Sequence, residues 1–235
     1  MQDAATAWRR PARSRAGLPD AAWRLQAARF ITIEAQEESV RLARKSAAYN
    51  GLSDRYEIRL GDFRDSARLK PNPTTASGDP GLQAGPAPVL GADEQFDLVV
   101  GSPPYFPPGT GIEGDHPQKI ACRFELRGDI NDYAQVAAVH LEAGGIFACV
   151  FPEEQRERVE RAASRTALSI VRRRPVVFRE GEPPLITLFA MVRAGDLPER
   201  MRARTWIEPP LIIRSADGSI HPEYAAVKLA VGFPP

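Results

Sequence analysis

Ser102, Pro103, Pro104 and Tyr105 follow directly after the apolar run Phe96–Gly101, and their types and order suit the binding of a planar amine. Each proline fixes its own φ at about −65°, and Pro104 keeps Pro103 out of the helical region, so the carbonyl groups of Ser102 and Pro103 point in nearly fixed directions. Such carbonyls accept hydrogen bonds from an exocyclic –NH₂ group and help its nitrogen to become a nucleophile. Tyr105 offers a flat face on which a base stacks. The alternative is an ordinary proline-rich turn with a core tyrosine.

Glu34 and the pair Asp62-Phe63 are further candidates, because they follow the apolar runs Phe30–Ile33 and Tyr56–Leu60. In an open α/β sheet, ligands bind outside the carboxyl ends of the strands. We therefore expect Glu34 to accept both hydroxyls of a ribose, and Asp62 and Phe63 to bind an adenine amine and pack against its ring. The alternatives are that Glu34 only complements the dipole of the next helix and that Asp62 only belongs to a turn.

The elements that must position these residues alternate between strand and helix. Strands are predicted at residues 30–33, 56–60, 96–100 and 145–151, and helices at 38–49, 132–141 and 153–167. Two later strands, near 169–178 and 185–192, flank the turn 180–184 and form a hairpin. The pattern predicts an α/β fold with a doubly wound, mostly parallel, Rossmann-like sheet and an antiparallel C-terminal hairpin.

Two segments differ in composition from the rest of the chain. Residues 1–29 are rich in Ala and Arg, and we interpret them as disordered or foreign to the fold. Residues 71–93 mix proline with glycine and predict an inserted surface loop. The remainder, residues 30–235, is expected to form one domain around that loop.

Charge and cysteine content exclude several classes of protein. The chain has 31 basic and 30 acidic residues, a net charge of +1, so no global basic field indicates nucleic acid. The arginine run 172–174 contacts phosphates in one interpretation and forms a solvated sheet edge in the other. Cys122 and Cys149 suggest neither a metal cluster nor a disulfide framework, which favours the reducing cytoplasm. The three histidines lack ligand spacing and no apolar run reaches about 18 residues, so neither a metal nor a membrane span is expected.

The succession ITIEAQEESVRLARKSAAYNG, RLGDFRD and FDLVVGSPPYF resembles the class I S-adenosylmethionine-dependent methyltransferases. Among them it is most similar to bacterial enzymes that methylate N6 of adenine in a valine tRNA. The segment Ala121–Glu125 resembles an Ala-Arg-His-like segment of that group, and residues 211–224 resemble its C-terminal tail. The resemblance spans residues 30–224.

The resemblance implies a monomeric cytoplasmic enzyme. Its implied cofactor is S-adenosylmethionine, and its implied partner is RNA, in particular tRNA. The residues implied to bind the cofactor are Glu34, Asp62, Phe63 and Ser102. Those implied to form the catalytic turn are Ser102, Pro103, Pro104 and Tyr105, and those implied to contact the substrate are Tyr105, Phe106 and Arg123. The target base must be single-stranded or flipped out of its stack to reach the turn.

Two departures from the family leave alternatives open. Ser102 stands where the family usually has Asn, and the serine form resembles the motif of DNA cytosine-N4-methyltransferases. Residues 1–29 also lack the glycine-rich loop, acidic-x-Gly-x-Gly, that cradles the cofactor, so we expect a sheet without its first strand. A truncated or shifted reading frame, an unusual cofactor site, or a non-catalytic RNA-binding or scaffold relative would each explain this. Methylation of a glutamine amide in a protein is a further alternative, since that –NH₂ has similar geometry.

Overall fold

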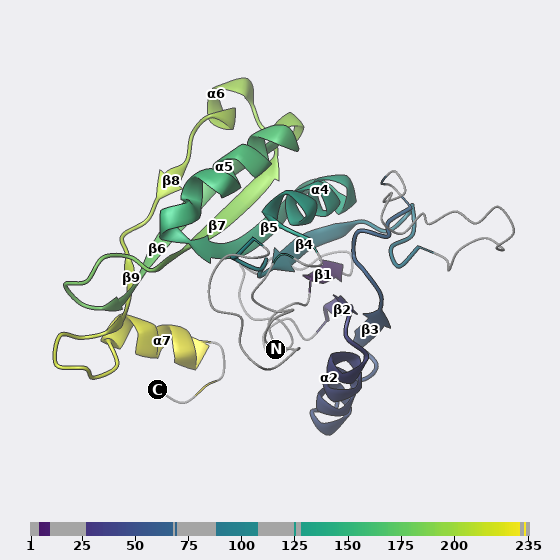
Figure 1. Ribbon diagram of the computed structural model, residues 1–235, viewed down its shortest axis with the longest axis horizontal. Coiled ribbons are helices and arrows are strands. Elements are labelled where there is room, and N and C mark those ends of the chain that lie inside the picture. Colours follow the sequence, from purple (N-terminus) through teal and green to yellow (C-terminus); the bar gives the residue numbers. More distant parts are fainter. Residues whose placement is uncertain are drawn as a thin grey trace, which may run out of the picture.

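The computed structural model describes residues 5–9, 27–67, 69, 88–107, 125, 128–230 and 233. Figure 1 shows that they form one sheet, with helices packed along it. The strands that precede Glu34, Asp62 and Ser102 run in one direction, and their carboxyl ends meet at one edge of the sheet.

The elements predicted from the sequence are present, with ends that shift by a few residues. They are β2 (Arg29–Glu34), α2 (Glu37–Tyr49), β3 (Tyr56–Leu60), β4 (Phe96–Gly101), α4 (Ile130–His140), β5 (Leu141–Pro152), α5 (Arg156–Arg165), β6 (Leu168–Arg179) and β7 (Ile186–Arg193). Four short C-terminal elements were not predicted individually. They are α6 (Glu199–Arg202), β8 (Trp206–Ile207), β9 (Leu211–Arg214) and α7 (Pro222–Ala230).

The described strands form one nine-stranded sheet with the order β3-β2-β1-β4-β5-β7-β6-β8, and β9 pairs with β6. The parallel pairs are β2 with β3, β4 with β5, and β6 with β8 and β9. Only β1 (Ala5–Arg9) and β7 run antiparallel to their neighbours in the part of the chain that the structure describes. All the other described strands share one direction, which confirms the predicted mostly parallel sheet with its antiparallel hairpin.

The strand β1 corrects the expectation that the sheet would lack its first strand. Ala5–Arg9 lies between β2 and β4, with Ala7 paired to both Ile31 and Val99. Without a strand in this position, the backbone donors and acceptors of β2 and β4 would be left unpaired inside the sheet, which is costly. The direction of β1 is antiparallel, so its carboxyl end lies at the edge of the sheet opposite to Glu34.

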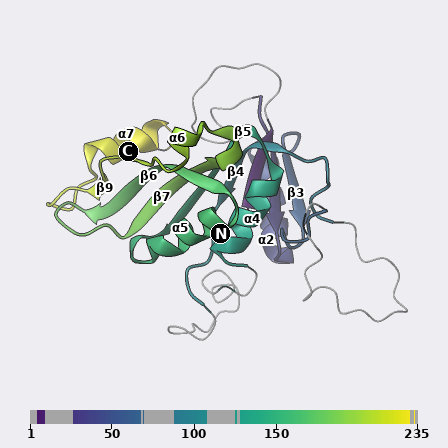
Figure 2. The ribbon, with the colours of Figure 1, turned by 90° about the horizontal axis from the view of Figure 1, so that it is seen from above.

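Helices cover both faces of the sheet, as a doubly wound fold requires. Ile31 and Ile33 of β2 belong to the large core beneath α4 and α5. Side chains alternate between the two faces of a strand, so Thr32 and its partner Ile58 face the other way. Ile58 packs against Val40, which places α2 on the opposite face from α4. Figure 2 shows α4 and α5 together on one side of the strands.

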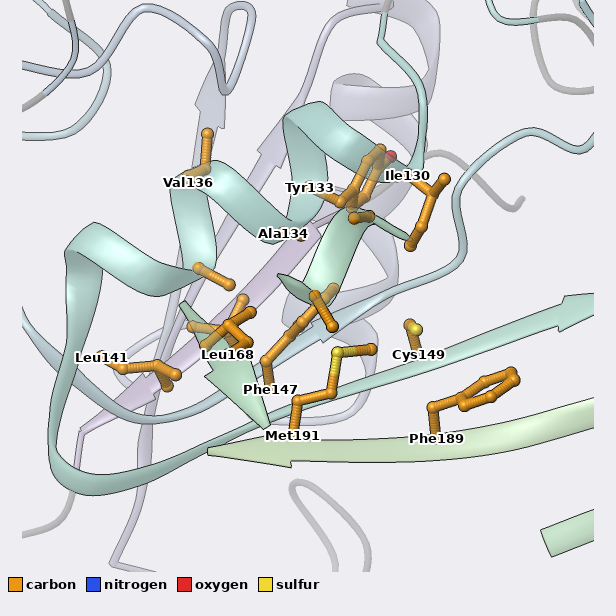
Figure 3. Close-up of a cluster of buried hydrophobic side chains, with 14 of the residues drawn as sticks. Ile130, Tyr133, Ala134, Val136, Leu141, Phe147, Cys149, Leu168, Phe189 and Met191 are labelled. Carbon is orange, nitrogen blue, oxygen red and sulfur yellow. The ribbon is translucent and has the colours of Figure 1, made fainter. Parts of the chain in front are cut away.

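The main core lies between the central strands and the helices α4 and α5 (Figure 3). Phe147 of β5 and Met191 of β7 are completely buried in it, and Ile130 and Ala134 of α4 pack from above. Burial of each such side chain stabilises the fold by about 1.5–3 kcal/mol. The strands that end at the candidate site are therefore anchored on a close-packed base.

A row of paired residues crosses the sheet at the level where β4 ends. It consists of Gly101, Cys149, Phe189, Arg173 and Ile207, each paired with the next on the neighbouring strand. Neighbouring strands lie about 4.8 Å apart, so these four steps separate β4 from β8 by roughly 19 Å along the sheet. The row relates the candidate site to the far edge of the molecule.

The end of the predicted surface loop 71–93 packs more tightly than expected. Leu90 is only 2% exposed, and it forms an isolated parallel bridge with Ser66. The Ser66 hydroxyl lies 2.6 Å from Nε2 of the buried His140, which ties this segment to the end of α4. The described end of the loop thus belongs to the core, whereas residues 71–87 lie outside the described residues.

Candidate functional site

Glu34 and Ser102 lie at the same level of the sheet, on either side of β1. Thr32 of β2 pairs with Thr6, and Thr6 pairs with Val100 of β4. Glu34 and Ser102 both lie two residues beyond this row, two strand spacings or about 10 Å apart. The fold therefore brings the two strand-end candidates to one edge, as the sequence predicted.

The Glu34 side chain is nearly buried, with 7% of the residue exposed. Its Oε1 accepts the backbone N–H of Gln36 at 2.9 Å, and its backbone carbonyl accepts the N–H of Gly61 at 3.1 Å. The second bond holds the turn after β3 against the end of β2, so Asp62 follows close beside Glu34. A buried carboxylate at a strand end is suited to accept hydroxyl hydrogen bonds from a ligand.

Asp62 is bound by a neighbouring arginine rather than left available. Arg64 donates its backbone N–H to Oδ1 at 2.9 Å, its Nε–H to the same oxygen at 2.9 Å, and its terminal N–H to Oδ2 at 2.5 Å. The carboxylate raises the pKa of the Arg64 guanidinium. Arg64 therefore already occupies most of the carboxylate that was expected to bind an adenine amine, and no motif in the sequence predicts this partner.

Phe63 packs in the core beside this turn. The residue is 7% exposed, and its ring centroid lies 4.4 Å from that of Tyr133, with the planes tilted by 49°. Gly128 leaves room for it: a Cβ there would lie 3.0 Å from Phe63 Cζ, and its φ of +116° favours glycine as well. Phe63 thus supports the turn from inside the fold, and its contact with an adenine stays a prediction.

The turn Ser102–Tyr105 is partly buried where β4 ends. Pro103 and Pro104 are buried, while Ser102 and Tyr105 are half-buried. The Tyr105 ring meets Phe151 edge to face, with centroids 5.5 Å apart and planes at 81°. Burial raises the pKa of Tyr105, and a hydrogen bond with Ser102 opposes that rise. The phenol is therefore neutral near pH 7, and its ring is held in a defined orientation.

Gly101 allows a helix to approach the end of β4. A Cβ at this position would lie 2.5 Å from Cδ1 of Tyr133 on α4, so a larger residue would displace that ring. The tyrosine packs there because α4 begins at a capping box, in which Asp129 accepts the N–H of Asp132 and Asp132 accepts the N–H of Asp129. Burial raises the pKa of Asp132.

Arg158 and Glu125 hold the turn from the side of α5. Neither residue was expected from the sequence to contact the turn. Arg158 forms an ion pair with Glu125, and its Nη1–H donates to the Tyr105 carbonyl at 3.4 Å. Its guanidinium carbon lies 5.5 Å from the ring centroid of Phe151. Burial raises the pKa of Glu125, and the bond from Arg158 opposes that rise. An arginine within a charged amphipathic helix carries no sequence signal for such a contact.

Of the two predicted substrate residues after the turn, the structure describes Phe106. Phe106 is half-buried, and its carbonyl accepts the backbone N–H of Glu125 at 2.9 Å. Phe106 therefore lies beside Tyr105 and within the same cluster. Arg123 lies outside the described residues.

The edge fits S-adenosylmethionine only in part. Glu34 is a nearly buried carboxylate at this edge, and its contact with ribose hydroxyls stays a prediction, as does the cofactor contact of Ser102. Asp62 is engaged by Arg64, however, and β1 runs antiparallel, so its carboxyl end lies at the opposite edge of the sheet. The cradle that a parallel first strand would provide is absent from the described residues.

Metal ligation was not expected, and no cluster of three or more His, Cys, Asp or Glu side chains suited to a metal occurs within the described ranges. Cys149 on β5 is a free thiol, and burial raises its pKa. Among the described helices, none is both long and apolar enough to cross a membrane.

Comparison with solved structures identifies the fold. The crystal structure of a predicted O-methyltransferase from Agrobacterium tumefaciens superposes with a TM-score of 0.56, covering 86% of this chain and 77% of that one at 17% identity. The chain shares the fold of that predicted O-methyltransferase. This confirms the Rossmann-like architecture that the resemblance implied.

The methyltransferase fold agrees with the sequence relatives. The tRNA1(Val) (adenine(37)-N6)-methyltransferase of Pasteurella multocida is 27% identical over 135 residues, and that of Salmonella typhi is 26% identical over 137. The matches cover 57% and 58% of this chain and 51% of each relative, so the chain spans about half the length of these relatives. No family model matches the sequence.

Proposed function

We propose that this chain transfers a methyl group from S-adenosylmethionine to the exocyclic amine of a nucleobase, with adenine in a cytoplasmic tRNA as the target. The observation that carries the proposal is the rigid turn Ser102–Tyr105 at the end of β4, level with the buried Glu34. The likeness to two tRNA adenine-N6-methyltransferases supports the choice of base and RNA.

The turn supplies binding and orientation in this proposal. The two N–H groups of the target amine donate to the carbonyls of Ser102 and Pro103, which draws the nitrogen lone pair out of conjugation with the ring. The base stacks on Tyr105, whose ring is steadied by Phe151. No strong base is needed beforehand, because the amine loses its proton after methylation, and positioning provides most of the rate.

Cofactor binding requires one rearrangement. S-adenosylmethionine supplies an electrophilic methyl group when bound, and Glu34 would hold its ribose. Asp62 would receive the adenine amine after giving up part of its fork of bonds from Arg64. Phe63 keeps the turn that carries Asp62 packed against Tyr133.

Calorimetric titration with S-adenosylmethionine, followed by transfer of a labelled methyl group to a valine tRNA transcript, tests the proposal. Saturable binding with label at adenine supports it. Label at cytosine would show that the target base is cytosine and not adenine. Label on a glutamine peptide offered in parallel would show that the substrate is a protein and not RNA.

Tyr105→Ala separates stacking from cofactor binding. Loss of a stacked base costs about 1–3 kcal/mol, so methyl transfer should fall by roughly 5- to 150-fold while cofactor affinity is unchanged. Tyr105→Phe keeps the ring and is the matched control, with near wild-type transfer expected. Equal rates for the alanine variant and the wild type would remove Tyr105 from the site.

A non-catalytic RNA-binding relative is the second candidate. It is favoured by the engagement of Asp62 with Arg64 and by the direction of β1, since both leave the cofactor side incomplete among the described residues. Folded protein that binds the tRNA transcript but shows no heat of binding with S-adenosylmethionine would establish this candidate in place of the enzyme.

A further inference from the structure

A basic and aromatic surface occupies the edge of the sheet opposite to β3 and α2. Every residue from Glu199 to Ile207 is exposed, including Arg200, Arg204 and Trp206. Trp206 is 68% exposed, an unusual state for so large an apolar ring. Arg200, Arg204, Trp206 and the adjacent Arg172 are called the basic edge below, and Figure 1 shows α6 and β8 at this side of the molecule.

The charges of Arg200 and Arg204 in the basic edge are available for binding. Within the part of the chain that the structure describes, Arg200 and Arg204 take part in no ion pair. Of the nearby acids, Glu208 is already paired with Arg172, and Glu199 is exposed at the start of α6. The guanidinium of Arg172 lies 5.8 Å from the Trp206 ring centroid, so cation and ring form one face.

The arginine run 172–174, for which phosphate contact was one interpretation, is largely engaged inside the protein. Arg173 pairs with Glu160 at 3.5 Å, and Arg174 pairs with Glu223. These pairs favour the solvated edge for the run itself. The unpaired cations stand one strand further out, on the segment that ends in β8.

The basic edge is held in place by the sheet. The Thr205 hydroxyl donates to the Ile170 carbonyl at 2.6 Å, and the N–H of Glu208 donates to the Arg173 carbonyl at 2.9 Å. Ile207 also closes the row of paired residues that starts at Gly101, roughly 19 Å away along the sheet. A ligand that reaches both the turn Ser102–Tyr105 and the basic edge needs a charged backbone at least roughly 19 Å long.

We propose that the basic edge binds the RNA substrate at a distance from the methylated base, with Arg200 and Arg204 contacting phosphates and an unpaired base stacking on Trp206. The inference rests on the proposed function for the identity of the ligand. Arg200 and Arg204, which form no ion pair within the described residues, lie on the same exposed segment as Trp206. This combination matches a polyanion with flat bases, since base stacking on aromatic side chains tolerates any sequence.

The test measures binding of a valine tRNA transcript at several salt concentrations, without cofactor. Arg200→Gln with Arg204→Gln should weaken binding about tenfold and lower the slope of log K against log salt by about 2, one for each lost phosphate contact. Arg202 is left unchanged because its Nε–H donates to the Leu197 carbonyl. Arg41→Gln with Lys45→Gln, on the exposed side of α2, removes the same charge at the opposite edge and should leave the slope unchanged.

Trp206→Ala tests the stacking separately. Its affinity for the transcript should fall by roughly 5- to 150-fold with an unchanged salt slope, and Trp206→Phe should restore most of the loss.

Wild-type affinity in both basic-edge variants, an equal loss in the α2 control, or a change in oligomeric state in place of RNA affinity would each overturn the inference. If the wild-type protein methylates the RNA and the basic-edge variants bind it with wild-type affinity, the role of the basic edge is refuted and the proposed methyl transfer stands. RNA binding that depends on the basic edge, without methyl transfer, would refute the proposed activity alone.

Discussion

At the scale of single residues, Tyr105 is the side chain whose position is most constrained. Phe151 meets its ring edge to face, and Arg158 holds its carbonyl while also lying over Phe151. The same guanidinium pairs with Glu125, whose N–H bonds to Phe106. Three contacts thus converge on Tyr105 and Phe106, and Arg158 links their partners by contacting Phe151 and Glu125 as well.

Arg158→Ala should loosen the turn. A misplacement of about 1 Å costs up to 100-fold in rate, so we expect kcat for methyl transfer to fall by about 10- to 100-fold with little change in the KM for cofactor. Arg158→Lys keeps the charge but loses the planar fork, and should recover only part of the rate. Steady-state kinetics on the tRNA transcript measures kcat and KM for both variants. An unchanged kcat in Arg158→Ala would show that the turn keeps its position without Arg158.

The sequence predicted the places of these residues better than their partners. Glu34 and Ser102 could be located because each follows an apolar run, and the run fixes which edge of the sheet it reaches. The pairing of Asp62 with Arg64 depends on how a turn curls over three residues, which no spacing rule determines. The contact of Arg158 with Tyr105 joins segments 53 residues apart and needs the docked position of α5.

At the scale of elements, the start of α4 combines capping with a buried acid. Asp132 accepts the N–H of Asp129 at 2.9 Å, and burial raises its pKa above the ordinary value of 3.8. Arg64 lowers that pKa, while the charges of Asp129 and Asp62 raise it. The helix therefore begins on a carboxylate whose charged form is disfavoured by its surroundings.

Asp132→Asn should change how stability depends on pH. Because the folded pKa lies above the unfolded one, the native state holds more protons in that interval, and wild-type stability falls as pH rises through it. The asparagine oxygen still accepts the N–H of Asp129 but carries no charge. Urea unfolding between about pH 4 and pH 7 should show the variant gaining stability relative to wild type as pH rises. A constant difference across that range would contradict the assignment.

Most elements were predicted because their apolar periodicity is long and regular, as in β4 and β5. β1 was missed, since five residues of a segment rich in Ala and Arg carry little strand signal by themselves. The position between β2 and β4 supplies the partners that make Ala5–Arg9 a strand, and that tertiary effect is invisible locally. The two-residue β8 was missed for the same reason.

At the scale of the whole molecule, β1 joins two halves of the sheet. It is the only described strand that connects β2 and β3 to β4 and the strands beyond it. The cofactor candidate Glu34 lies on one half and the turn Ser102–Tyr105 on the other. The relative position of the two parts of the site therefore depends on these five residues.

Ala7→Pro tests this dependence. A proline inside a central strand loses a ladder hydrogen bond, and the partner left unsatisfied inside the sheet costs about 1–3 kcal/mol. Hydrogen exchange should show loss of protection in β2 and β4, with protection retained where β5, β7 and β6 pair. Ala7→Gly, which costs only about 0.5–1 kcal/mol, serves as control. Unchanged protection in the proline variant would mean that β1 is dispensable for the sheet.

The row from Gly101 to Ile207 also sets a minimum length for the substrate. A single-stranded RNA that occupies both the turn and the basic edge has to span roughly 19 Å along the sheet. A fragment containing only the target base and its immediate neighbours would reach the turn but not Trp206. Turnover of progressively shortened RNAs should therefore drop in one step, at the length that no longer spans the turn and Trp206, and not decline gradually with length.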